Sequence, residues 1–156
     1  RGTSSPQGTS EGEFDGGRAE AFDVSAAVKF VTEAGLPNPW LVGWSFGTDL
    51  ALKYGPDHEV LGAILLSPPL HRTSDEELER WNAVAKKLVA LIPEHDDYLK
   101  PAEALDRFSL INEIELVNVD DAKHLWVGES ATKRVLDEIT RIVNPAAYPL
   151  PEFISL

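Results

Sequence analysis

Residues 40–48 hold a serine in a setting that could make it a nucleophile. An apolar run leads directly into the pattern G-x-S-x-G, in which Ser45 lies between Gly43 and Gly47. A strand that turns sharply into a helix needs small residues on both sides of the turn, and the turn leaves the serine hydroxyl exposed. The residues after Gly47 are typical of a helix that stops at Gly55. We therefore interpret Ser45 as a candidate nucleophile.

A serine hydroxyl is too weak an acid to attack a carbonyl group unaided, so a base must take its proton. An imidazole can do this, and a carboxylate can fix the imidazole tautomer and stabilise its charged form. Residues 94–97 (Glu-His-Asp-Asp) supply carboxylates, and residues 120–124 end in His124. The chain thus holds, in the order Ser45, an aspartate and His124, the three groups that nucleophilic acyl transfer requires.

Helical and extended patterns alternate along residues 18–144, which we expect to form the domain. This alternation predicts an α/β fold with a parallel sheet of about four strands flanked by helices. Residues 1–17 are predicted to form a loop and residues 145–156 a Pro-rich tail. We expect helices at 18–34, 49–54, 74–84, 101–108 and 130–143, and strands at 40–42, 60–66, 88–92 and 114–119.

In an open parallel sheet, ligands bind outside the carboxyl ends of the strands. Ser45 follows the first expected strand, residues 94–97 follow the third and residues 120–124 follow the fourth. These segments should therefore meet on one rim although they are far apart in sequence. His71 follows the second strand and could contact a substrate there, with a structural role as the alternative.

Two tryptophans lie close in sequence to the proposed catalytic residues. Trp44 precedes Ser45 and Trp126 follows His124. Large aromatic side chains at such places could shape an apolar substrate pocket, and packing in the core is an equal alternative.

Composition excludes several classes of function. The net charge of −12 argues against a nucleic-acid partner or an anionic membrane surface, because no basic patch exists to release counterions. The apolar runs are too short to span a membrane. The chain has no cysteine, which excludes disulfides, thiolate metal sites and a cysteine nucleophile, and fits a cytoplasmic location. We expect no cofactor and no catalytic metal.

A metal-dependent hydrolase is one alternative. The residues His95, Asp96, Asp97, Asp120, Asp121 and His124 offer imidazole and carboxylate groups, which can hold divalent metals. That interpretation leaves the G-x-S-x-G pattern unexplained, so we favour the metal-free serine chemistry.

Four stretches together resemble the C-terminal part of an α/β-hydrolase, near the dienelactone-hydrolase-like and small serine esterase branches. Residues 1–17 resemble the glycine-rich loop after the family's fourth strand, and residues 43–47 resemble its nucleophile elbow. Residues 96–101 are similar to the stretch that carries the acid, and residues 122–126 to the histidine loop. The resemblance covers residues 1 to about 143.

The resemblance implies a role for each matching residue. Ser45 would be the nucleophile, His124 the general base and acid, and Asp96 the carboxylate that orients the imidazole. Asp97 is the rival of Asp96, but the family pattern leaves one residue between the acid and an aromatic residue, here Tyr98. The backbone N–H of Phe46 would be one oxyanion-hole donor. The implied function is a serine hydrolase that cleaves an ester or related acyl bond.

The chain also departs from the family pattern. The family's sheet has eight strands, whereas this sequence begins after the fourth, so a second oxyanion donor and half of the sheet have no counterpart. The chain also starts at Arg1 rather than at a methionine. We therefore expect a piece of a longer enzyme, or a chain that covers its bare strand edge by self-association. The alternative function is a truncated, non-catalytic binding module.

Overall fold

The structure is a computed structural model, and it describes residue 16 and residues 18–151. Its centre is a four-stranded parallel sheet in which strands that follow one another in sequence are neighbours in space. This arrangement confirms the predicted α/β class and the number of strands. In the order β1-β2-β3-β4, the strands are β1 (Trp40–Trp44), β2 (Gly62–Leu66), β3 (Lys87–Pro93) and β4 (Glu115–Val119).

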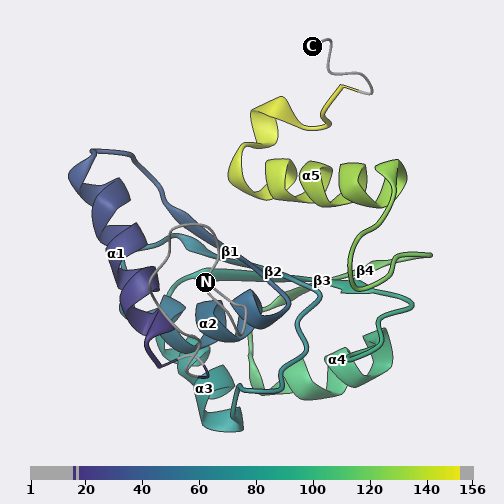
Figure 1. The fold of residues 1–156 in the computed structure, drawn as a ribbon, viewed down its shortest axis with the longest axis horizontal. Helices are drawn as coiled ribbons and strands as arrows, with labels where there is room; N and C mark the ends of the chain where they lie inside the picture. Colours follow the sequence, from purple (N-terminus) through teal and green to yellow (C-terminus); the bar gives the residue numbers. More distant parts are fainter. Residues whose placement is uncertain (1–15, 17, 152–156) are drawn as a thin grey trace.

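Helices cover both faces of the sheet (Figure 1). Helix α5 (Glu129–Val143) lies on one face, and α2 (Phe46–Tyr54), α3 (Asp75–Glu79) and α4 (Pro101–Arg107) lie on the other. Helix α1 (Glu20–Glu33) packs against α2. Short 3₁₀ helices at Gly55–Asp57, Arg80–Ala83, Phe108–Leu110 and Pro145–Ala147 follow α2, α3, α4 and α5.

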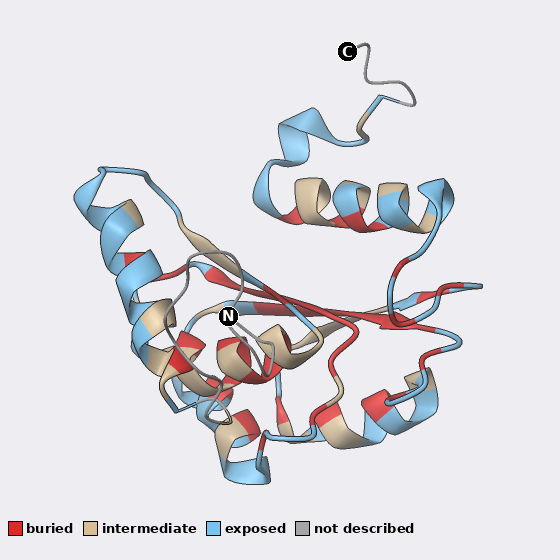
Figure 2. Cartoon of the chain, in the orientation of Figure 1, coloured by how far each residue is buried: buried red, intermediate tan, exposed pale blue. Residues whose placement is uncertain are grey.

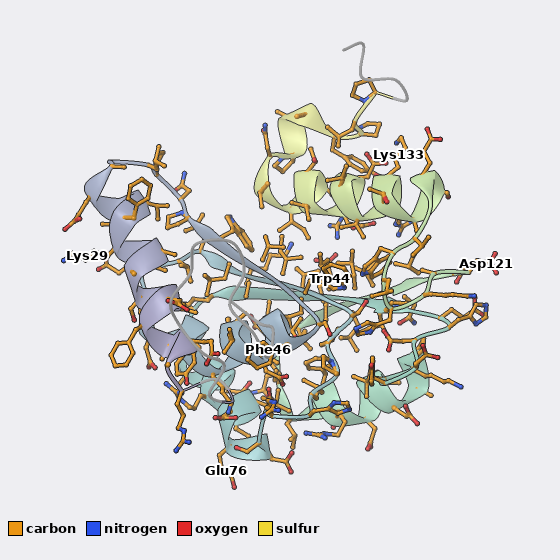
Figure 3. The ribbon with its side chains drawn as sticks, in the orientation of Figure 1. Lys29, Trp44, Phe46, Glu76, Asp121 and Lys133 are labelled. Atoms are coloured by element: carbon orange, nitrogen blue, oxygen red, sulfur yellow. The ribbon has the colours of Figure 1, made fainter. Side chains whose placement is uncertain are left out.

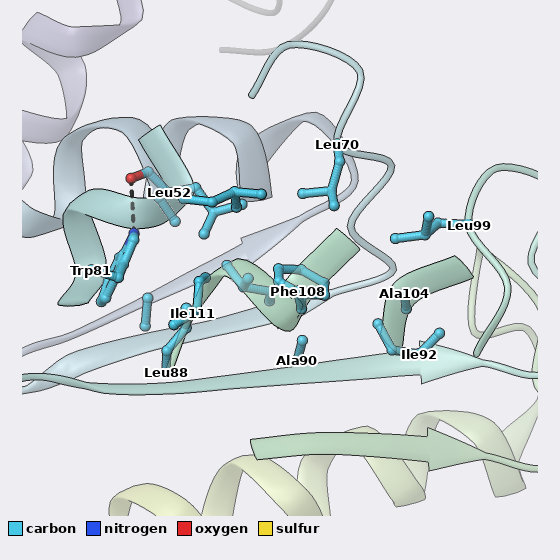
Figure 4. Packing of buried hydrophobic residues seen from close by; sticks show 14 residues of the cluster. Leu52, Leu70, Trp81, Leu88, Ala90, Ile92, Leu99, Ala104, Phe108 and Ile111 are labelled. Atoms are coloured by element: carbon cyan, nitrogen blue, oxygen red, sulfur yellow. Dashed lines mark hydrogen bonds between the residues drawn. The ribbon is translucent and has the colours of Figure 1, made fainter. Parts of the chain in front are cut away.

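Two apolar cores, one on each side of the sheet, hold these layers together. Side chains alternate across a strand, so Leu88, Ala90 and Ile92 of β3 face α2, α3 and α4, while Val89 and Leu91 face α5. Figure 4 shows the larger core, in which these β3 residues pack below the helices. The central strands β2 and β3 are buried along nearly their whole length, whereas the edge strands β1 and β4 are only partly buried and each helix is buried only on its inner side (Figure 2). The continuous apolar run of β2 is buried on both faces, as its pattern predicts.

Specific hydrogen bonds fix the start of α3 and the segment that follows α5. Ser74 and Glu77 form the predicted capping box of α3: the Ser74 hydroxyl accepts from the Glu77 N–H at 3.3 Å, and the Glu77 carboxylate accepts from the Ser74 N–H at 2.8 Å. After α5, the backbone N–H of Leu150 donates to Asp137 at 3.0 Å, which ties part of the tail to that helix.

Apart from Gly16, the predicted loop at residues 1–17 lies outside the described residues. No helix in the described part of the chain is long and apolar enough to cross a membrane. The cytoplasmic location expected from the sequence stays a prediction.

Candidate active site

Ser45 joins the end of β1 to the first turn of α2 in a strained backbone conformation. Its φ is 50° and its ψ is −120°, a region that residues other than glycine seldom occupy. The Ser45 N–H donates to the Leu66 carbonyl at 2.9 Å, and its own carbonyl accepts from the Thr48 N–H at 2.8 Å. These bonds fix the turn from both sides, and Ser45 Oγ lies at the carboxyl end of the sheet.

The two glycines of the G-x-S-x-G pattern differ in their surroundings. A Cβ on Gly43 would lie 2.4 Å from the Gly47 carbonyl oxygen, so the first turn of α2 passes too close for any side chain. A Cβ on Gly47 would meet no described atom within 4 Å. The described part of the structure therefore explains the need for Gly43 but not for Gly47.

Three side chains from three strand ends form one hydrogen-bonded set. Ser45 Oγ lies 2.8 Å from His124 Nε2. On the other side of the imidazole, His124 Nδ1 lies 3.0 Å from Asp96 Oδ2 and 3.2 Å from Oδ1. These residues follow β1, β4 and β3, so the predicted meeting on one rim takes place. In this geometry the carboxylate can hold the imidazole with Nε2 directed at the serine.

Asp96, and not its neighbour Asp97, makes the contact with His124. Asp96 is buried, at 2% exposure, and its Oδ1 also accepts from the backbone N–H of Tyr98 at 2.8 Å. Asp97 is exposed. The turn after β3 thus directs the first carboxylate inward and the second into solvent.

The His124 carbonyl accepts two hydrogen bonds that hold the histidine loop in place. The Ser67 hydroxyl donates to it at 3.0 Å, and Trp44 Nε1 donates to it at 3.1 Å. Ser67 is buried and has a φ of 49°. Sequence reasoning missed Ser67, although its place directly after the buried strand β2 was a signal that it belongs to the same rim.

Aromatic rings lie on the solvent side of the imidazole. The Tyr98 ring packs edge-on against His124, with ring centroids 4.6 Å apart and planes at 70°. His71 packs in the same way against Tyr98, at 5.3 Å. Tyr98 and His71 are both exposed. His71 therefore lies near the rim, as expected, but one ring away from His124.

The two tryptophans have different surroundings. Trp44 is 49% exposed, on the α5 side of the sheet, whereas Phe46 lies on the α2 side, as Figure 3 shows. Trp126 is 7% exposed and packs in the core beneath α5. Of the two expectations for Trp126, this placement matches packing in the core and not a substrate contact, because the chain turns at Trp126 with a φ of 52° and the indole fills the space between α5 and the sheet.

Asp49 is a buried carboxylate that sequence reasoning did not single out. It lies in the first turn of α2, where its Oδ1 accepts from the Thr73 hydroxyl at 2.6 Å and from the Arg72 N–H at 3.3 Å. Burial raises the pKa of Asp49, and these hydrogen bonds oppose the rise. Asp49 joins the nucleophile's helix to the loop after β2, whose Arg72 guanidinium lies 5.9 Å from the centre of the Phe46 ring.

The candidate ligands of a catalytic metal do not form one cluster. His124 contacts Ser45 on one side and Asp96 on the other, and Asp97 and Asp120 are exposed. Glu94, His95 and Asp121 form a second, exposed group in which His95 Nε2 lies 3.9 Å from a Glu94 oxygen and 3.7 Å from an Asp121 oxygen. Ser45, His124 and Asp96 therefore form one hydrogen-bonded set. Among the described residues, no group of metal-ligating side chains lies at Ser45.

Comparison with known proteins shows a likeness of fold to solved structures. No protein-family model and no curated protein matches the sequence. Among solved structures, an α/β serine hydrolase homologue from Coxiella burnetii is similar, with a TM-score of 0.70 at 20% identity over 89% of this chain. XC6422 from Xanthomonas campestris, described as an α/β serine hydrolase without a lid, has a TM-score of 0.66 at 22% identity over 95% of this chain.

An esterase domain from Rhodothermus marinus is also similar, with a TM-score of 0.64 at 17% identity, over 81% of this chain and 70% of its own. This chain spans 64% of the length of the Coxiella protein and 64% of the Xanthomonas protein. At such identities the likeness is one of fold.

Proposed function

We propose that this chain, which has the C-terminal part of the α/β-hydrolase fold, is the nucleophile-bearing part of a serine hydrolase that cleaves an ester or related acyl bond. The observation that carries the proposal is the continuous set of hydrogen-bond distances from Ser45 Oγ through His124 to Asp96. The esterases and serine hydrolases among the structural neighbours support it at the level of fold.

In the proposed reaction, His124 Nε2 takes the hydroxyl proton as Ser45 Oγ attacks the acyl carbon. Asp96 stabilises the imidazolium that forms. The imidazolium then gives its proton to the leaving alcohol as the bond to the acyl carbon breaks, and an acyl-serine remains. Water attacks that acyl group with His124 again acting as the base, which releases the acid and restores the serine.

Charge on the acyl oxygen must be stabilised during each attack. Phe46 begins α2, and the N–H groups of a first helical turn point toward the helix N-terminus, where they favour negative charge. In this fold a second donor comes from a loop after an earlier strand, and the described residues include no counterpart of that loop. Losing one donor typically slows such a reaction by about 10²–10³-fold, so we expect slow turnover by this chain alone.

The edge of β1 also points to a missing neighbour. In the described part of the chain, β1 pairs only with β2, and its Val42 and Trp44 are about half exposed. An unpaired strand edge with exposed apolar side chains beside it favours pairing with another strand. We propose that this edge is covered either by the rest of a longer chain or by self-association.

A non-catalytic binding module is the second candidate. The 64% span favours it, since part of the machinery has no counterpart here. The intact arrangement of Ser45, His124 and Asp96 argues against it, because a module that only binds has no need to hold a strained serine against a buried imidazole–carboxylate pair.

Intact-mass labelling with a fluorophosphonate tests the proposal. We expect one adduct on the wild-type chain and none on Ser45→Ala. Ser109→Ala is the matched control, because Ser109 is an exposed serine whose hydroxyl donates to the Asp106 carbonyl, on a 3₁₀ helix remote from the elbow, and it should be labelled like the wild type. A folded wild-type chain that takes no adduct would favour the binding module.

A further inference from the structure

In addition to the proposed hydrolase site, we propose that Glu94, His95 and Asp121 form a binding site for a borderline divalent metal ion such as Zn²⁺ or Ni²⁺. In the described part of the chain, these residues form one group of three side chains whose potential ligand atoms all lie within 4.8 Å of one another. The group has a nitrogen ligand at its centre, with one carboxylate on each side.

The distances are close to those that a metal would impose. With metal–ligand bonds of about 2.0–2.2 Å in a tetrahedral arrangement, ligand atoms lie roughly 3.3–3.5 Å apart. His95 Nε2 lies 3.9 Å from Glu94 Oε2 and 3.7 Å from Asp121 Oδ1. Closing the two gaps to His95 Nε2 takes shifts of roughly 0.2–0.6 Å, and the Asp121 side chain is 99% exposed and thus free of packing that would oppose them.

The backbone already holds the two ligand-bearing turns together. The Asp121 N–H donates to Glu94 Oε2 at 2.9 Å, the Glu94 N–H to the Val119 carbonyl at 3.0 Å, and the His95 N–H to the Ala122 carbonyl at 2.9 Å. These bonds fix the relative position of the two turns before any metal arrives, and the exposed side chains of His95 and Asp121 then have only to turn toward the ion. Metal binding therefore need not order a loop first, which would otherwise weaken it.

The donor set decides which ions fit. One imidazole with two carboxylates suits Zn²⁺ and Ni²⁺, whereas Mg²⁺ and Ca²⁺ prefer oxygen ligands alone. The three side chains leave at least one coordination position for water. The chain's net charge of −12 further favours a cation.

An ion bound at Glu94, His95 and Asp121 would connect the turn after β3 with the turn after β4. His95 directly precedes Asp96 in the turn after β3, and Asp121 lies three residues before His124 in the turn after β4. In Figure 3, Asp121 lies at the outer end of its loop, away from Trp44 and Phe46. A metal bridging His95 and Asp121 would join the two turns that carry the imidazole and its carboxylate without touching Ser45.

Isothermal titration of the wild-type chain with NiCl₂ and with ZnCl₂ at about pH 7.5, where a histidine is mostly neutral and able to ligate, tests the site. We expect one equivalent to bind with micromolar affinity, MgCl₂ to give no heat, and the metal to raise the melting temperature. His95→Asn should weaken binding at least tenfold and abolish the shift in melting temperature, and Asp121→Asn should weaken binding as well.

His58→Asn is the matched control. His58 also lies between two acidic residues in sequence, Asp57 and Glu59, but its Nε2 faces the Ser25 hydroxyl at 3.2 Å, so its replacement should leave binding unchanged. Circular dichroism checks that each variant is folded. No binding by the wild type, or full binding by His95→Asn, would overturn the proposal. Loss of binding in His124→Gln with retention in His95→Asn would also overturn it, because the metal would then sit beside Ser45.

Discussion

The Ser67 hydroxyl donates a hydrogen bond to the carbonyl oxygen of His124 at 3.0 Å, and it does so from a buried position at the end of β2. A side chain from the second strand thus fixes the loop that carries the imidazole, while the first and third strands supply Ser45 and Asp96. All four strands of the sheet therefore contribute to the geometry of one site.

Replacing Ser67 with alanine tests this support. Alanine keeps the Cβ at the positive φ but removes the hydroxyl, and a typical hydrogen bond of this kind contributes about 1 kcal/mol. We expect Ser67→Ala to lower the free energy of unfolding by about that amount and to slow fluorophosphonate labelling of Ser45. Ser109→Ala removes an exposed hydroxyl–carbonyl bond and serves as the control. Equal labelling rates for both variants would show that the Ser67 bond does not position His124.

Comparing variants of the adjacent residues Asp96 and Asp97 identifies which carboxylate stabilises the His124 imidazolium. Asp96→Asn keeps the size of the side chain but removes the charge that stabilises the imidazolium, and the same change in the Ser-His-Asp triad of a serine protease with a different fold lowers kcat by about 10⁴-fold. We expect labelling of Ser45 in Asp96→Asn to slow by several orders of magnitude. Asp97→Asn, at the exposed neighbour, should label at the wild-type rate. The reverse result would reassign the acid to Asp97.

The two elbow glycines should respond oppositely to alanine. Gly43→Ala places a Cβ 2.4 Å from the Gly47 carbonyl oxygen, and overpacking of this kind costs about 1–3 kcal/mol or more. Gly47 lies within α2 with space around it, so Gly47→Ala should stabilise the chain by up to about 1 kcal/mol through helix propensity. Urea unfolding measures the free energy of unfolding of both variants. A destabilised Gly47→Ala variant would indicate a close neighbour outside the described residues.

The buried Asp49 carboxylate predicts a dependence of stability on pH. Burial raises the pKa of Asp49 above its ordinary value of 3.8. The folded chain therefore holds this proton more tightly than the unfolded chain, and the contribution of Asp49 to stability falls as pH rises through the window above 3.8. Asp49→Asn keeps an oxygen to accept from Thr73 and Arg72 but carries no charge.

We therefore expect Asp49→Asn to be more stable than the wild type at neutral pH, with the difference shrinking to zero as the pH falls below 3.8. Urea unfolding at a series of pH values measures the difference in the free energy of unfolding between the variant and the wild type. Taking this difference removes the contributions of all other titrating groups, because both chains share them. Asp106→Asn, at an exposed position on α4, should show a nearly flat difference. A flat difference for Asp49→Asn would contradict the raised pKa.

The proposed edge interaction of β1 predicts concentration-dependent association of the isolated chain. Val42 is 50% exposed on this strand, and a lysine there should oppose pairing with another strand. We expect size-exclusion chromatography to show larger species for the wild type as concentration rises, and a monomer for Val42→Lys. Leu105→Lys, at an exposed position of α4, is the control. A wild-type chain that stays a monodisperse monomer would count against the proposal.

Local sequence patterns were sufficient to predict the elements and the fold class. The continuous apolar run of β2 predicted a central strand, and the alternation of strands and helices predicted a parallel sheet; both were confirmed. The order of Ser45, Asp96 and His124 along three strand ends also followed from sequence, because the carboxyl ends of parallel strands share one rim.

Only the tertiary structure decided which side chains meet. The family resemblance favoured Asp96 over Asp97, but the local pattern did not separate them, because adjacent residues in a turn give no periodic signal and their directions depend on how the turn after β3 packs against β4. Trp126 is buried in the core because α5 lies over it. The His124 carbonyl meets the Ser67 hydroxyl because the turns after β2 and β4 come close together at the carboxyl end of the sheet. Contacts of this kind join residues that are distant in sequence, so they exist only once the strands are aligned in register.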